Sequence, residues 1–147
     1  MERRSSTATA RMGARAHRVL LVDDDPALLM VLARAFTRAG YATKTAENGR
    51  KALELVAAYH PHLVVTDIVM PEMEGIGAII AIKQMADPPK VIAMSGTGPV
   101  GRRNYLKWAK HLGADEVLSK PFRLEEMLGL ASQLIAKDSD QLINCGS

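Results

Sequence analysis

Five short runs of strand-forming residues alternate with segments of helical periodicity, and this alternation limits how the chain can fold. The runs lie at residues 17–22, 41–46, 63–66, 91–94 and 116–119. Apolar side chains recur at helical spacing in the segments that follow, at 27–39, 52–57, 76–85, 100–112 and 124–135. Strands and helices in strict alternation form a parallel sheet with helices on both faces. We therefore predict an α/β domain with five strands and five helices.

The excess positive charge lies in the first part of the chain. Residues 1–18 carry five Arg and one Glu, whereas the remainder has 14 Lys and Arg against 15 Asp and Glu. We therefore predict a disordered basic leader over 1–17, one domain over 18–136 and a polar tail over 137–147. A near-neutral domain argues against binding to nucleic acid. No apolar run could cross a membrane. The single Cys145 suits a reducing cytoplasm.

Polar side chains follow four of the predicted strands. Asp23 and Asp24 follow the first strand, Asp67 the third, Ser95 the fourth and Lys120 the fifth. The carboxyl ends of parallel strands meet at one edge, which is where α/β sheets bind ligands. Each residue alone has a simpler structural explanation, as a helix cap, a turn residue or a surface charge. The shared edge favours a functional site.

The residue types at this edge indicate magnesium and phosphoryl chemistry. Crowded carboxylates repel one another unless a cation lies among them. A site made of oxygen ligands alone favours Mg²⁺, and without His or Cys it disfavours zinc. Asp67 can then act as a nucleophile toward phosphorus, with Lys120 neutralising the transferred group and Ser95 donating to it.

The motifs VLLVDDDPALL, LVVTDIVMPEMEG, VIAMSG and GADEVLSKPF closely resemble the receiver domain of two-component response regulators. The resemblance covers residues 18–136. It implies a flavodoxin-like (βα)5 sandwich of three layers, with a parallel sheet in the order 2-1-3-4-5. It also implies phosphorylation by a sensor histidine kinase or a histidine phosphotransfer protein, and a signalling role rather than that of an enzyme with a separate substrate.

The resemblance also assigns roles to individual residues. Asp67 matches the phosphoacceptor, Ser95 the switch hydroxyl, and Lys120 the phosphate-binding lysine. Asp24 matches the direct Mg²⁺ ligand, and Asp23 a ligand that acts through water. The Val69 backbone carbonyl would complete the protein ligands. Further assignments are a cis bond before Pro121 and a helix-capping role for Asp25.

One position departs from the family pattern. Many receivers carry an aromatic residue three positions before the lysine, where this chain has Val117. Rotation of an aromatic side chain therefore cannot transmit the signal, and movement of the loop 95–99 is the preferred alternative.

No effector module is expected after residue 136, so the chain resembles a stand-alone receiver whose output is contact with another protein. Residues 88–114 contain no acid. Basic side chains accompany Tyr105 and Trp108 there, which makes 100–119 a candidate partner surface or a site of homodimerisation linked to phosphorylation. A solvated helix with Trp108 packed on the sheet explains the pattern equally well.

Two other functions remain open at this stage. A pseudo-receiver would bind a partner constitutively with a vestigial site, but the complete set of site residues argues against it. A haloacid-type phosphatase would place its nucleophile in an Asp-x-Asp motif after the first strand, which Asp23 and Asp25 satisfy. Asp67 at a strand end and the KPF motif make that hypothesis the weaker one.

Overall fold

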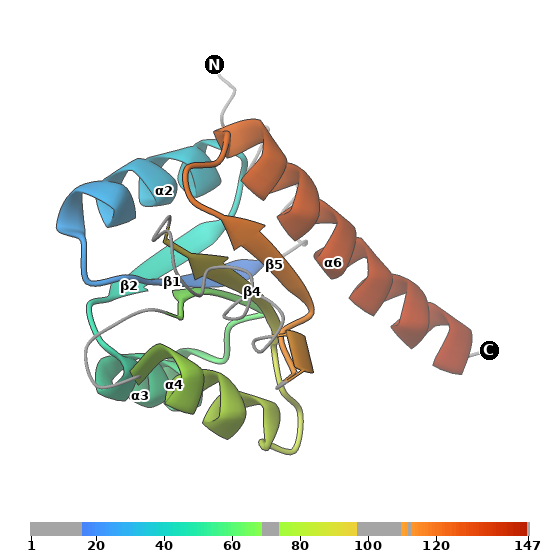
Figure 1. The fold of residues 1–147 in the computed structure, drawn as a ribbon. Helices are drawn as coiled ribbons and strands as arrows, with labels where there is room; N and C mark the ends of the chain where they lie inside the picture. The colour runs from blue at the N-terminus through green and yellow to red at the C-terminus, as the bar shows by residue number, and fades with distance from the viewer. Residues whose placement is uncertain (1–15, 69–73, 97–109, 112, 147) are drawn as a thin grey trace.

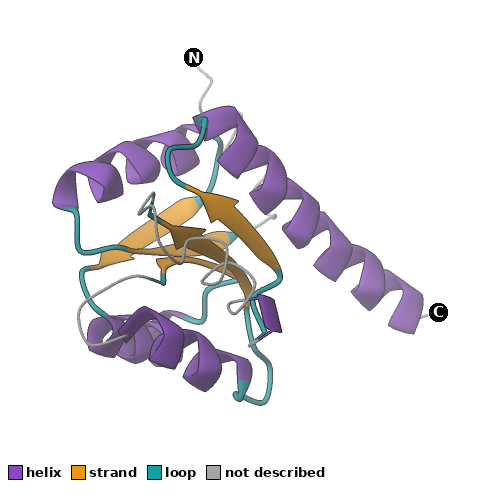
Figure 2. Cartoon of the chain, viewed as in Figure 1, coloured by secondary structure: helices purple, strands orange, loops and turns teal. Residues whose placement is uncertain are grey.

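The computed structural model describes residues 16–68, 74–96, 110–111 and 113–146. Five parallel strands form one sheet in the order β2-β1-β3-β4-β5, as predicted. The strands are β1 (Arg18–Val22), β2 (Ala42–Ala46), β3 (Leu63–Asp67), β4 (Lys90–Ser95) and β5 (Glu116–Ser119). The helices are α2 (Pro26–Arg38), α3 (Gly49–Tyr59), α4 (Glu74–Lys83) and α6 (Leu124–Gly146). The sheet is the middle of three layers (Figures 1 and 2).

Alternate residues of each central strand supply the two cores, because successive side chains of a strand point to opposite faces. Leu20 and Val22 of β1 belong to the core with α3 and α4, whereas Val19 and Leu21 belong to the core with α2 and α6. All four are fully buried. In Figure 1, α3 and α4 lie together below the sheet, α2 lies above it, and α6 runs from above it down its right-hand side. A strand buried on both faces explains the unbroken apolar runs in the sequence.

The predicted fourth helix, 100–112, falls almost wholly outside the described residues. Only positions 110 and 111 of it are described, and both are helical. The other predicted helices correspond to α2, α3 and α4, with ends shifted by a few residues, and to α6, which is longer than predicted.

The C-terminal segment differs from the prediction. We expected a helix over 124–135 followed by a polar tail over 137–147, but α6 continues to Gly146. The segment between Lys137 and Cys145 contains no Pro or Gly. A polar composition does not end a helix unless a breaking residue accompanies it. The second half of α6 runs past the sheet (Figure 1).

The turn between β1 and α2 is held by Asp25, whose predicted role as a helix cap is confirmed. Its Oδ1 accepts from the backbone amides of Ala27 at 3.0 Å and Leu28 at 3.4 Å, and Pro26 begins the helix. Both features are typical of a helix start. This cap fixes the direction in which the chain leaves Asp23 and Asp24.

Replacing Asp25 with Ala is expected to lower the free energy of unfolding by about 1 kcal/mol, because two amides of the first turn lose their acceptor. Urea denaturation followed by circular dichroism measures this. Asp87→Ala, which removes an exposed acid with no capping bond, is the matched control and should cost little. Equal losses in the two variants would refute the capping role.

Among the described helices, none is long and apolar enough to cross a lipid bilayer.

Candidate functional site

The carboxyl edge of the sheet collects the polar residues that the sequence predicts there. Asp23 and Asp24 directly follow β1, Asp67 ends β3, Ser95 ends β4, and Lys120 directly follows β5. Because β1, β3, β4 and β5 are consecutive neighbours in the sheet, their ends form one continuous rim. The parallel topology thus brings residues nearly 100 positions apart in sequence to a single site.

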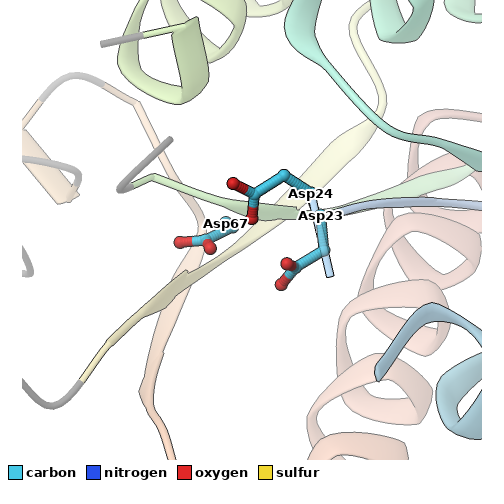
Figure 3. Close-up of side chains that lie close together, drawn as sticks. All are labelled: Asp23, Asp24 and Asp67. Carbon is cyan, nitrogen blue, oxygen red and sulfur yellow. The ribbon is translucent and has the colours of Figure 1, made fainter. Parts of the chain in front are cut away.

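Three carboxylates converge on this rim. One oxygen each from Asp23, Asp24 and Asp67 can be chosen so that all lie within 4.8 Å of one another. Figure 3 shows these side chains gathering from the ends of β1 and β3. Asp23 is fully buried and Asp67 is 5% exposed, whereas Asp24 is exposed. Three acids this close, two of them out of water, require positive charge nearby.

Lys120 supplies part of that charge. Its Nζ donates to Asp23 Oδ2 at 2.7 Å and to Asp67 Oδ2 at 3.1 Å. Burial of the ammonium lowers the pKa of Lys120, but the hydrogen bonds and negative charges of Asp23 and Asp67 outweigh burial, so that its pKa is raised. Lys120 is therefore a charged donor at neutral pH. The peptide bond that joins it to Pro121 is cis, in agreement with the resemblance.

The second oxygen of Asp23 is also engaged. Asp23 Oδ1 accepts from the backbone amide of Asp25 at 2.9 Å. Asp23 therefore holds the turn after β1 with one oxygen and Lys120 with the other. The side chain of Asp25 instead caps α2. Asp25 therefore does not belong to the acidic cluster, which consists of Asp23, Asp24 and Asp67.

Ser95 lies on the same rim between Asp67 and Lys120. It is 1% exposed, and its hydroxyl donates to the Gly96 carbonyl at a long 3.4 Å. The backbone amide of Lys120 donates to the Ser95 carbonyl at 2.8 Å, which ties the end of β4 to the start of the loop after β5. A side chain with so weak a bond can turn toward another acceptor at small cost.

Two predicted parts of the site lie outside the described residues. One is Val69, expected to offer its carbonyl to the metal. The other is most of the candidate partner surface at 100–119, of which 110–111 and 113–119 are described. Both stay predictions.

Comparison with known proteins identifies the family. A family model described as "Response regulator receiver domain" matches residues 19–132 of this chain. The chain belongs to this family. A receiver domain is a signalling module of two-component systems, and the matched range contains Asp23, Asp24, Asp67, Ser95 and Lys120.

Individual relatives agree with this assignment. The response regulator MprA of Mycolicibacterium vanbaalenii is 33% identical over 120 residues, which cover 82% of this chain and 51% of that protein. The chain thus spans about half the length of the curated relatives it matches. The receiver domain of a response regulator from Bermanella marisrubri has a TM-score of 0.74 and 28% identity, covering 82% of this chain and 99% of that one. The chemotaxis response regulator CheY4 of Vibrio cholerae shares the fold, with a TM-score of 0.70 and 24% identity over 82% of this chain and 99% of that one.

The receiver site contains one contact that sequence reasoning missed. We assigned Lys120 to the phosphoryl group and Asp23 to the metal, yet the shorter bond of Lys120 is to Asp23. The order of strands predicts that these residues share an edge but not which carboxylate the ammonium reaches. Charge balance could have indicated this contact. Two buried acids need a nearby cation even when no ligand is bound, and Lys120 is the cation at this edge.

The acidic cluster suits a magnesium ion. It is the one group of three or more metal-ligating side chains within the described residues, and it contains only carboxylates. Mg²⁺ prefers oxygen ligands and usually combines one or two carboxylates with water and phosphate oxygens. The exposed Asp24 faces solvent, from which an ion and its waters would arrive. The residues present therefore fit Mg²⁺.

Proposed function

We propose that this receiver domain accepts a phosphoryl group on Asp67. The observation that supports the proposal most strongly is the double contact of Lys120 with Asp23 and Asp67 beside a third carboxylate. A buried acid at a strand end, with a permanent cation 3.1 Å from its Oδ2, is arranged to be a nucleophile whose product is an anion.

In the proposed reaction a carboxylate oxygen of Asp67 attacks the phosphorus of a phosphohistidine. The new bond joins that oxygen to phosphorus, the phosphorus–nitrogen bond breaks, and the departing imidazole takes up a proton. The product is an acyl phosphate on Asp67. The Lys120 ammonium lies close enough to follow the added charge, and the Ser95 hydroxyl, weakly bonded where it stands, is the proposed donor to a phosphoryl oxygen.

Asp24 and Asp67 would bind Mg²⁺ directly, Asp23 would bind it through water, and the Val69 carbonyl would complete the protein ligands. When bound, the ion neutralises negative charge on the phosphoryl oxygens. Asp23 serves the site in a second way, because it keeps Lys120 in place with a 2.7 Å ion pair.

The proposal extends to partners and location. A sensor histidine kinase or a histidine phosphotransfer protein would supply the phosphoryl group in the cytoplasm. Output would be contact with another protein or a second copy through 100–119, with no role for nucleic acid or membrane. Val117 of β5 pairs with Ala93 of β4, and its partly buried side chain packs against the core formed with α3 and α4. An aliphatic side chain there supports output through the loop that follows Ser95.

Intact-mass measurement after incubation with phosphoramidate tests the proposal without a kinase. With Mg²⁺, the mass is expected to rise by about 80 Da, the increment of one phosphoryl group. With EDTA, incorporation is expected to fall at least about tenfold, because Lys120 alone then neutralises the charge on the transferring oxygens. A chain that stays unmodified with Mg²⁺, both with this donor and with acetyl phosphate, would instead be a pseudo-receiver that binds its partner constitutively.

A further inference from the structure

A cavity of about 410 Å³ lies at the amino edge of the sheet, the edge opposite Asp67. It is bounded by the starts of β1, β3 and β4, by the end of α3, and by the segment that follows α4. These two helices lie side by side beneath the sheet (Figure 1). The volume falls within the range of roughly 300–1,000 Å³ that is typical of small-molecule sites.

The rim at this edge is fixed by the backbone. The amide of His62 donates to the Arg18 carbonyl at 2.8 Å, and the amide of Lys90 donates to the His62 carbonyl at 3.1 Å. The amide of Arg18 donates in turn to His62 Nδ1 at 2.9 Å. Three neighbouring chain segments are thereby held at one level, so the cavity is formed before any ligand binds.

The cavity combines an apolar wall with basic groups. Pro61 and Pro89 are buried, and the half-buried Met85 packs against the core. Lys90 also lines the cavity, and its ammonium makes no hydrogen bond or ion pair with any described residue. Sites for small organic molecules combine these two features, an apolar wall for the body and a few polar groups for the head.

Arg18 has a structural explanation of its own. Its guanidinium donates to the carbonyls of Tyr59 at 3.0 Å and of His60 at 2.7 Å, and so satisfies the end of α3. No acid pairs with it among the described residues, and the one acid lining the cavity, Asp87, is unpaired there as well. Arg18 and Lys90 against Asp87 therefore leave one excess positive charge in the lining. The capping role accounts for Arg18 but not for Lys90 or for the cavity itself.

We propose that this cavity binds a small organic anion, with an apolar body against Met85 and Pro89 and an acidic head toward Lys90 and His60. The site lies at the far edge of the sheet from the phosphoacceptor, and the inference does not rest on the function proposed for Asp67. The favoured ligands bear a carboxylate, sulfonate or phosphate on an aromatic or aliphatic body, since Coulomb attraction selects the head and burial selects the body.

Titration with 8-anilinonaphthalene-1-sulfonate, an aromatic anion that fluoresces when bound, tests the site on the intact chain. One molecule per chain is expected to bind. Lys90→Glu should weaken binding at least about tenfold, whereas Lys51→Glu, the same change at an exposed position of α3, should not. The uncharged N-phenyl-1-naphthylamine should bind equally well to wild type and Lys90→Glu, because it has the same body without the acidic head.

A second variant distinguishes loss of the binding site from a folding defect in Lys90→Glu. Ala57 is exposed on α3 and lines the cavity, so Ala57→Glu should also weaken binding of the sulfonate without altering the thermal midpoint. Amide shifts in heteronuclear NMR should cluster at residues 57, 60, 62 and 90. Equal binding by the Lys90 and Lys51 variants, or shifts clustered elsewhere, would overturn the proposal.

Discussion

The Asp67→Asn variant is expected to take up phosphate from phosphoramidate at least roughly 100-fold more slowly than wild type, because the amide that replaces the carboxylate is a very poor nucleophile. The substitution preserves the shape of a side chain that is 5% exposed, so the fold should persist. Intact mass against time measures the effect, with circular dichroism as the check on folding. The reaction needs no kinase, so loss of a docking surface cannot produce the same result.

Asp25→Asn is the matched control for Asp67→Asn. Asp25 lies within the same acidic stretch as Asp23 and Asp24, but its side chain caps α2. An Asn can cap a helix as well as an Asp does. Asp25→Asn should therefore be modified at the wild-type rate. Uptake by Asp67→Asn that matches the control would exclude Asp67 as the acceptor.

The Lys120→Met variant is expected to lose about 3 kcal/mol of unfolding free energy in EDTA, because it leaves two buried carboxylates without their cation. Asp23 is fully buried, and Lys120 is its ion-pair partner at 2.7 Å. Added Mg²⁺ should recover part of the loss, since an ion that binds the folded state alone stabilises it. Urea denaturation with and without Mg²⁺ measures both effects.

The difference in unfolding free energy between wild type and Lys120→Met is expected to decrease at high pH. In the folded chain burial lowers the pKa of Lys120, but the hydrogen bonds and charges of Asp23 and Asp67 together outweigh burial and raise that pKa above its ordinary value. The stabilisation from its charge is therefore complete below the ordinary lysine pKa and is lost as the pH rises through the raised value. Wild type and Lys120→Met should differ throughout the neutral range and converge only in strong alkali.

Lys83→Met provides the comparison for Lys120→Met. Lys83 pairs with Asp115 at 3.0 Å, but both side chains are partly exposed, Lys83 by 20% and Asp115 by 24%. Water can solvate the carboxylate that remains, so the loss should be nearer 1 kcal/mol and independent of Mg²⁺. A Lys120→Met variant as stable as wild type in EDTA would contradict the role given to the ion pair.

The sheet and its active edge follow from the sequence for a physical reason. Runs such as Val19 to Val22 are apolar at every position because both faces of the strand are buried. Strands of that kind belong to parallel sheets, and parallel strands bring their carboxyl ends together. Asp67 and Lys120 could therefore be placed at one site before their contact was seen.

Three other features of the structure could not be predicted from the sequence pattern. The length of α6 was underestimated because a polar sequence after Ile135 was treated as a stop, although no breaking residue is present. The Lys120–Asp23 ion pair depends on side-chain conformation across 97 positions of sequence. The amino-edge cavity depends on how chain ends pack, and its lining residues form no motif along the chain.

Borohydride reduction of the phosphorylated chain tests the central claim most directly. The reagent reduces an acyl phosphate to an alcohol, so a phosphorylated aspartate becomes homoserine, about 14 Da lighter than aspartate. After phosphoramidate and Mg²⁺ treatment, peptide mass mapping is expected to find homoserine at position 67 and aspartate at positions 23 and 24. Homoserine at 23 or 24 with aspartate at 67 would contradict the assignment of Asp67 as the phosphoacceptor.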